Sequence, residues 1–477
     1  MLQKISELFE LFESNKIDYC HWKSINHLDA TLKGITDLDI LVDDSKSNLL
    51  ETQLLVIGFE RFETVILRSY PGIHDYVCLD ISGVWVHLHL HYKLNLGDRW
   101  VKAFHYPIEK RVLSRSLYLE DVNTKIVNPY DELMMLCLRM CLKFKNPFND
   151  KLIKEEMIFI KANIKAITDD YNDYYEILPN LKLLIDTILN NSSIDFNKLN
   201  KISKSVTKEL TAFRRFNLVT FKYLSLKRKV YRYYIEFRRR FIKEFSVGRR
   251  EISNGGKIIA IVGIDGSGKT SVVSEMQYFY SRQMNVTRVF LGNGQSGASW
   301  YRKLIFNFYG TKFKNSKGSK STKKRTSTFY ALWILLCLFD KENNLKKAIK
   351  ARANGNLVLS DRWPQNKISG TFDGARLDFE KSKNFIVKYV QKRENKFLKM
   401  SKLISPDLVI KLKIKPEISI LRKPNELSID EATSNSLLLD DLIWNECRHE
   451  IIDASDDFIT VSESVKKKIW ELITNNF

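Results

Sequence analysis

An apolar, largely β-branched run at 258–262 passes directly into Gly-Ile-Asp-Gly-Ser-Gly-Lys-Thr at 263–270. Such a run predicts a buried parallel strand. The octapeptide matches the pattern G-x-x-x-x-G-K-[ST], in which glycines let successive backbone N–H groups converge on phosphate oxygens. The helix expected at 270–283 directs the positive end of its dipole at the same anion. A strand, loop and helix in this order predict a sheet built around a bound phosphate group.

The loop predicts a site for ATP and Mg²⁺. Lys269 is expected to reach the β and γ phosphates, and the Thr270 hydroxyl to ligate Mg²⁺. A second apolar strand at 357–361 ends in Asp361, the carboxylate that such a site needs beside its metal. Arg362 follows it and can bond a second phosphate group bidentately. The residues predicted to hold the nucleotide at the loop are Gly263, Asp265, Gly266, Ser267, Gly268, Lys269 and Thr270.

Strands and helices alternate beyond residue 256, which predicts an α/β fold of the P-loop NTPase type, a parallel sheet with flanking helices. The expected strands lie at 257–262, 286–291, 357–361 and 408–414, and the expected helices at 270–283, 330–353 and from 462 onward. The predicted domains are an α+β domain at 1–125, a helical extension at 126–222, a basic amphipathic helix with a linker at 223–256, and the P-loop domain at 257–477.

Residues 257–477 resemble the thymidylate kinases and related nucleoside monophosphate kinases. The loop is similar to the family's G-x-[DE]-G-[SA]-G-K-[ST], Asp361-Arg362-Trp363 to its D-R-[YWFH], and 406–412 to its late P-D-L strand. The resemblance implies that Asp361 organises the Mg²⁺ shell and that Arg362 holds the phosphate of an acceptor. It also suggests a dimer.

Two later segments extend the resemblance. Residues 416–422 are similar to the helix that enters the family's lid, which implies Arg422 as a cation that neutralises the transferring phosphoryl group. Residues 452–455 resemble the segment that packs near the adenine, which places Asp453 and Ala454 beside the base. The implied catalytic residues are Lys269, Asp361, Arg362 and Arg422.

The segments that read thymidine monophosphate in the family are missing. The stretch at 291–297 replaces the family's R-E-P-[GT], and 364–374 replaces its S-x-x-A-Y-Q. Donor binding is therefore expected to carry over, whereas the acceptor is left as an unnamed small phosphorylated molecule. A basic, glycine- and serine-rich stretch at 310–326 predicts either a mobile loop or a clamp for a polyanion.

Two carboxylates stand two residues apart in the N-terminal half, at Asp37 and Asp39. On a strand they share one face, the geometry for holding a divalent metal. The surrounding pattern resembles the D-h-D motif of nucleotidyltransferases, although Lys23-Ser24 replaces the family's G-[GS] and the third carboxylate is unclear, Asp80 being considered. A surface D-x-D without function is the alternative. The histidines of the following hairpin also share a face, so a zinc site is a further alternative; they are His87, His89 and His91.

The chain of 477 residues carries a formal charge of +21, which favours polyanionic partners. Basic and aromatic residues alternate at helical spacing in 223–250 and predict an amphipathic helix. It is interpreted as an interdomain helix with a solvated charged face, or as a peripheral contact with an anionic membrane, and nucleic acid is not excluded. Six scattered cysteines and an N-terminus without a signal-peptide core predict a cytoplasmic protein.

Three hypotheses follow for function. The first is a P-loop kinase that transfers the γ-phosphoryl group of ATP to a nucleotide or another small phosphorylated acceptor. The second places nucleotidyl transfer at Asp37 and Asp39, alone or beside the kinase. The third is a non-catalytic module in which ATP binding alters contacts with a membrane or nucleic acid.

Overall fold

The computed structural model describes residues 1–64, 69–98, 100–164, 178–190, 195–242, 247–294, 298–305, 307, 328–377, 384–424, 428–444 and 447–474. The chain divides into two compact units, Met1–Glu244 and Phe245–Phe477. The basic stretch predicted at 310–326 lies outside the described residues. The predicted α/β class with a parallel sheet and covering helices is confirmed.

The sheet of the second unit runs in the order β12-β13-β11-β14-β15, with every neighbouring pair parallel. Its strands are β11 (Lys257–Gly263), β12 (Val286–Phe290), β13 (Leu357–Asp361), β14 (Leu408–Lys413) and β15 (Arg448–Asp453). The central strand β11 is buried from its second residue onward, which explains its continuous apolar sequence. Parallel strands end at one edge, so the last residues of β11, β13, β14 and β15 gather there.

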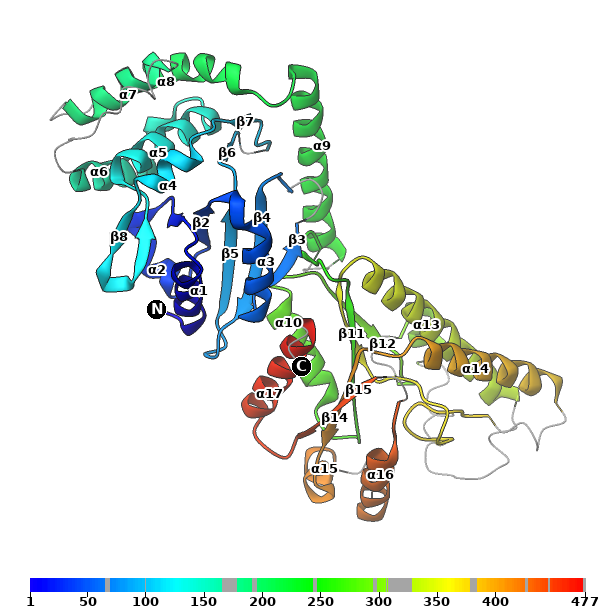
Figure 1. The fold of residues 1–477 in the computed structure, drawn as a ribbon. Helices are drawn as coiled ribbons and strands as arrows, with labels where there is room; N and C mark the ends of the chain where they lie inside the picture. The colour runs from blue at the N-terminus through cyan, green and yellow to red at the C-terminus, as the bar shows by residue number, and fades with distance from the viewer. Residues whose placement is uncertain are drawn as a thin grey trace. The chain divides into compact units, whose positions relative to one another are not determined.

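Helices cover both faces of this sheet, α10 and α17 on one side and α13 and α14 on the other (Figure 1). The helices are α10 (Lys269–Tyr280), α13 (Thr328–Ala353), α14 (Phe385–Leu403), α15 (Pro416–Arg422), α16 (Ile429–Asp441) and α17 (Phe458–Ile473). The last helix begins four residues before the predicted start at 462. The Asp457 side chain accepts hydrogen bonds from the backbone N–H groups of Ile459 and Thr460, so it caps the earlier turn.

The first unit has a mixed sheet in which β3, β4, β5, β2, β1, β9 and β8 follow one another. These strands are β1 (Tyr19–His21), β2 (Leu38–Val42), β3 (Glu60–Glu63), β4 (Ile73–Leu79), β5 (Trp85–His91), β8 (Leu117–Leu119) and β9 (Thr124–Ile126); β6 (Asn95–Leu96) pairs with β7 (Phe104–His105). The predicted hairpin is present, because β4 and β5 pair antiparallel.

Two apolar cores lie on the two faces of this sheet. Leu38 and Ile40 of β2 enter one core, whereas Leu41 enters the other. The first core also receives α1 (Gln3–Ser14) and α3 (Ser47–Val56), and the second receives the helical extension. The short helices of this half are α2 (Leu28–Leu32), α4 (Glu109–Ser114) and the single turns Ile25–His27, Asp44–Lys46 and Glu120–Val122.

The helical extension consists of α5 (Pro129–Lys143), α6 (Lys151–Asn163), α7 (Pro179–Asn190) and α8 (Phe196–Glu209), with short turns at Pro147–Asn149 and Leu210–Phe213. The basic helix α9 (Leu218–Phe237) starts earlier than the predicted 223, because the Asn217 side chain accepts a hydrogen bond from Thr220 N–H. It continues into a π-helical turn, Arg238–Ile242. Among the described residues, no helix has the length and apolarity to cross a membrane.

Candidate nucleotide site

The loop between β11 and α10 curls tightly because its glycines adopt conformations or contacts that a side chain would prevent. Gly266 and Gly268 have φ of +83° and +85°, in the left-handed region that favours glycine. A Cβ on Gly266 would lie 2.7 Å from the Ser419 carbonyl oxygen, and one on Gly263 would lie 2.5 Å from Ser267 Oγ. The Ser419 hydroxyl donates to the Asp265 carbonyl at 2.6 Å, so α15 packs directly on the loop.

Lys269 is buried at the first turn of α10. Its Nζ donates to the Ile264 carbonyl at 2.7 Å and lies 3.8 Å from Asp265 Oδ1. Burial, and then the nearby Arg362 cation, lower the pKa of Lys269 to about 8. A phosphate group brought to this ammonium would restore favourable charge pairing, which suits Lys269 to its predicted role.

Thr270 and Asp361 meet across the ends of α10 and β13. The Thr270 hydroxyl donates to Asp361 Oδ2 at 2.8 Å. Asp361 is fully buried, and its Oδ1 has no hydrogen-bond partner in the described part of the chain. Arg288 Nη2 lies 3.8 Å from Oδ2. A hydroxyl and a carboxylate with an unused buried oxygen are hard oxygen ligands of the kind Mg²⁺ prefers, so these residues fit the predicted ion.

Arg362 follows β13 with a φ of 77°, an uncommon backbone conformation for a residue with a side chain. Its guanidinium donates to Asp265 Oδ1 at 3.2 Å and lies 3.6 Å from Asp373 Oδ2. Phe372 and Asp373 also have positive φ, of 45° and 59°. The backbone at Arg362, Phe372 and Asp373 is therefore held in an uncommon conformation by the surrounding fold.

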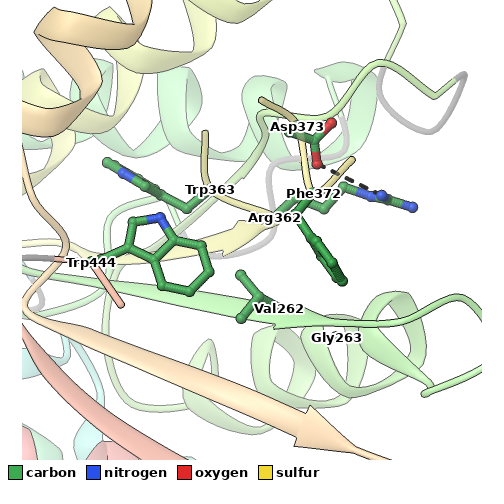
Figure 2. A pocket seen from close by; sticks show the side chains of 7 residues that line it. All are labelled: Val262, Gly263, Arg362, Trp363, Phe372, Asp373 and Trp444. Atoms are coloured by element: carbon green, nitrogen blue, oxygen red, sulfur yellow. Dashed lines mark ion pairs between the residues drawn. The ribbon is translucent and has the colours of Figure 1, made fainter. Parts of the chain in front are cut away.

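A small, partly open pocket lies beside Arg362. Arg362 and Asp373 lie on one side of it and Trp363 and Trp444 on the other (Figure 2). Its lining residues are Val262, Gly263, Arg362, Trp363, Phe372, Asp373 and Trp444. Sequence reasoning missed Asp373 and Trp444. Each reaches the site through a loop, and a loop has no periodic sequence pattern from which its path could be predicted.

The two predicted adenine-side residues lie at the end of β15 and directly after it. Asp453 is the last residue of that strand, and Ala454 N–H donates to the Lys413 carbonyl at 2.6 Å, at the end of β14. The predicted lid cation Arg422 donates to the Ala454 carbonyl at 2.9 Å. In this arrangement Arg422 therefore joins the predicted adenine side. The predicted phosphate side consists of Asp265, Lys269, Thr270, Asp361 and Arg362.

No protein-family model matches the chain. Curated proteins with similar sequences include the uncharacterized ATP-binding protein YghR of Escherichia coli K12, which is 27% identical over 218 residues, 44% of this chain and 86% of YghR. The uncharacterized ATP-binding protein YghS of the same strain is 27% identical over 35% of this chain and 74% of its own length. Thymidylate kinase of Prochlorococcus marinus AS9601 is 26% identical over 46% of this chain and 99% of the enzyme.

A second group of polar side chains lies in the first unit, on β2, β4 and β5. The register pairs Asp39 with His89, and pairs Asp75 with His89 from the other side. Asp37, directly before β2, contacts His87, with 2.6 Å between Oδ1 and Nδ1. The predicted Asp37 and Asp39 thus share one cluster with the predicted histidines.

Asp80, which was considered as the third carboxylate, lies beyond the end of β4 and not in this cluster. Its carboxylate accepts hydrogen bonds from Lys4 N–H at 2.9 Å and Ser82 N–H at 3.0 Å, so it closes the hairpin turn. Asp75 is the carboxylate that the structure brings to the group, and sequence reasoning missed it. A two-residue turn at Ser82-Gly83 would place Asp75 opposite Leu90, whereas the observed connection spans 81–83 and pairs Asp75 with His89.

Proposed function

We propose that this protein is an ATP-dependent phosphotransferase that moves the γ-phosphoryl group to a nucleotide or another small phosphorylated acceptor. The observation that carries the proposal is the position of Arg362. Its guanidinium lies at the same strand edge as Lys269 and the Thr270–Asp361 pair, and it is held only by carboxylates, those of Asp265 and Asp373, in the contacts described above. A phosphate group of an acceptor can take the place of one of these carboxylates.

The residues divide the work of such a transfer. The loop N–H groups and Lys269 hold the β and γ phosphates, and Thr270 with Asp361 holds Mg²⁺, which when bound neutralises charge on the phosphates. Arg362 orients the acceptor so that its oxygen attacks the γ-phosphorus while the bond to the β–γ bridging oxygen breaks and ADP leaves. The protein supplies positioning and electrostatic stabilisation, the main sources of catalysis in phosphoryl transfer.

Similarity to proteins named as ATP-binding and as thymidylate kinases supports ATP as the donor and a kinase-like reaction. This similarity does not identify the acceptor, because 364–374 differs from the family segment that binds thymidine monophosphate. In this chain that segment builds one wall of the pocket, with Phe372 and Asp373 facing Trp444. Aromatic walls beside a guanidinium suit a phosphorylated acceptor with a flat or apolar portion.

The test is ADP formation from ATP and Mg²⁺ with a panel of nucleoside monophosphates and sugar phosphates. At least one acceptor should raise ADP formation well above the rate in water. Arg362→Ala should then raise the acceptor KM at least about tenfold, from the loss of a bidentate phosphate contact. Arg282→Ala, at an exposed arginine in the turn after α10, is the matched control and should change neither kcat nor KM. Equal kinetics of Arg362→Ala and the wild type would refute the assignment of Arg362.

A second candidate, nucleotidyl transfer in the first unit, is favoured by the cluster of Asp37, Asp39 and Asp75. In that reaction an acceptor oxygen attacks the α-phosphorus of a nucleoside triphosphate and pyrophosphate leaves. Carboxylates that share a divalent metal would support it. The double variant Asp37→Ala with Asp39→Ala should abolish pyrophosphate release and leave ADP formation intact, so the two activities can be separated. Unchanged pyrophosphate release would remove this candidate.

A further inference from the structure

The cluster in the first unit contains imidazoles at positions where an oxygen-only magnesium site would have carboxylates or water. His87, His89 and His91 alternate along β5 and therefore face the same side of the sheet. The structure forms two triads of two imidazoles and one carboxylate, Asp37 with His87 and His89, and Asp39 with His89 and His91. In each triad the donor atoms lie within 4.8 Å of one another.

The two nitrogens of His87 and of His89 point to different partners. Nε2 of both rings lies close to Asp75 Oδ1, at 2.8 Å for His87 and 2.9 Å for His89. Nδ1 of each ring has a different partner. It lies 2.6 Å from Asp37 Oδ1 for His87 and 3.2 Å from Asp39 Oδ1 for His89. Asp75 therefore contacts Nε2 of both imidazoles, while Nδ1 of each ring lies beside a further carboxylate.

This pattern is the one found around histidine-ligated metals. A metal-binding histidine almost always donates its other ring N–H to a carboxylate, which fixes the tautomer and the ring orientation. A neutral imidazole has a single N–H, so an Nε2–H donated to Asp75 leaves a lone pair on Nδ1. Lone pairs from His87 and His89 would then face Asp37, the carboxylate that forms a triad with these two rings, while Asp39 lies beside His89.

The chemistry of the donors selects the ion. Mg²⁺ prefers six hard oxygens in a near-ideal octahedron, whereas imidazole nitrogen suits Zn²⁺ and other first-row transition-metal ions such as Fe²⁺, Ni²⁺ and Cu²⁺. Lys23 Nζ lies 2.7 Å from Asp39 Oδ1, so Asp39 already has a cationic partner and Asp37 is the more available oxygen ligand. The Asp37 side chain is 52% exposed, which leaves room for water or substrate on the open side.

We propose that His87, His89 and Asp37, assisted by Asp39, bind a divalent transition-metal ion in preference to Mg²⁺, with Asp75 as the positioning residue for both imidazoles. The proposal does not depend on the kinase assignment, because the P-loop residues take no part in it. It also departs from the nucleotidyltransferase resemblance, which implies a site built from carboxylates.

The test is the metal content and metal affinity of the full-length protein without nucleotide, which leaves the P-loop site without its phosphate ligands. Zn²⁺, Mn²⁺ and the spectroscopic probe Co²⁺ are each titrated in excess Mg²⁺, and bound metal is measured by mass spectrometry after gel filtration. About one equivalent per chain is expected, with a Co²⁺ visible spectrum that shows nitrogen ligands. Zn²⁺ or Co²⁺ that binds no more tightly than Mg²⁺ would overturn the proposal, and this result needs no variant.

Variants locate the ion. His89→Gln should lower the affinity for Co²⁺ at least about a hundredfold, and Asp75→Asn should lower it about 10- to 100-fold while retaining the nitrogen-ligand spectrum. His27→Gln, an exposed histidine outside the cluster, should bind as the wild type does. Circular dichroism confirms that each variant is folded. Unchanged Co²⁺ affinity in folded His89→Gln would place the ion elsewhere and refute the assignment.

A separate observation concerns the basic helix α9, which packs one side on the first unit and carries a row of apolar side chains on the other. Ser225 and Ile235 are buried, and Arg228 between them donates to the Trp100 carbonyl at 2.6 Å. Tyr223, Leu226, Val230, Tyr233 and Phe237 recur at steps of three and four on the opposite side, where they are 54% to 71% exposed. We define these five residues as the outer stripe.

The lysines and arginines around the outer stripe indicate which kind of partner it binds. Residues 218–242 contain eight lysines or arginines and one acidic residue, Glu236. At 100° per residue, Lys222 and Lys229 flank the stripe on one side and Lys227 on the other. Two copies of this helix would bring their cations together, which opposes self-association through the stripe. An anionic lipid surface attracts the cations and receives the aromatic side chains.

We infer that the outer stripe docks on an anionic membrane surface. Vesicles of phosphatidylcholine with phosphatidylglycerol should co-sediment with the wild-type protein, and vesicles of phosphatidylcholine alone should bind it much less. Tyr233→Glu with Phe237→Glu should weaken binding at least about tenfold, whereas Phe385→Glu, at an exposed site on α14, should not change it. Each cation removed from the flanks should weaken binding about fivefold.

Three outcomes would overturn this inference. Equal vesicle binding by the double variant and the wild type would show that the stripe is not the contact. A wild-type dimer that the double variant loses, without vesicle binding, would assign the stripe to a second copy of the chain. Binding to an oligonucleotide that persists in the double variant, again without vesicle binding, would assign the basic charge to nucleic acid.

Discussion

The low pKa of Lys269 predicts that nucleotide affinity falls as the pH rises through about 8. Phosphate binds the protonated form of Lys269. In alkaline solution Lys269 is deprotonated, so it must take up a proton when ATP binds. With a pKa of about 8, roughly three quarters of the ligand-free protein is protonated at about pH 7.5 and roughly a tenth at about pH 9. The Kd for ATP should therefore increase about eightfold between these values, equivalent to about 1.2 kcal/mol.

Fluorescence titration of ATP at several pH values measures this effect directly. Lys269→Arg is the matched control, because a guanidinium keeps its charge throughout this range, and its weaker affinity should not change with pH. Arg362 is one cause of the low pKa of Lys269, so Arg362→Gln should move the loss of affinity to higher pH. A wild-type Kd that is constant from about pH 7.5 to 9, or an equal loss in Lys269→Arg, would refute this reasoning.

Two further predictions concern the loop itself. Thr270→Ala removes the donor to Asp361 Oδ2 and should weaken Mg²⁺-dependent ATP binding about tenfold, while binding measured in chelator changes little; an equal loss in both conditions would contradict the assigned metal role. Gly266→Ala should destabilise the protein by about 1–3 kcal/mol more than Gly255→Ala in thermal unfolding. Both glycines have positive φ, but only the Gly266 Cβ would approach Ser419, so equal destabilisation would show that this contact is unimportant.

The sequence was most informative where function depends on local order along the chain. The octapeptide at 263–270 is specified by its own glycines and the adjoining strand and helix, with one further contact from α15, and Asp361 is the last residue of its strand. The strand at 357–361 has the predicted bounds, because its apolar run is short and ends at a charged residue. These features could be predicted because few distant contacts influence them.

The remaining features depend on contacts between distant segments. Asp373 reaches Arg362 through a loop that Gln365 holds by donating to the Ile368 and Thr371 carbonyls, at 2.7 and 3.0 Å. Such a path has no periodicity that a sequence displays. Asp75 was missed for a different reason, because its role depends on strand register, and the turn that fixes this register lies several residues away.

The helix α9 shows that amphipathic spacing does not fix which apolar side chains of a helix are buried. Phe221, Leu224 and Ile235 lie on the side that packs on the first unit, and Arg228 donates to the Trp100 carbonyl. The outer stripe is also apolar, yet it is exposed. The side of a helix that packs is set by the segments it contacts, and that information lies elsewhere in the chain.

Transfer of labelled phosphate from [γ-³²P]ATP tests the central claim most directly. With the acceptor that gives the highest ADP yield, the wild-type protein should place the label on that acceptor in an amount equal to the ADP formed. Lys269→Ala should reduce the labelled product at least about a hundredfold. A wild-type protein that binds ATP but releases the label only as inorganic phosphate, with every acceptor in the panel, would contradict the assignment of a phosphotransferase.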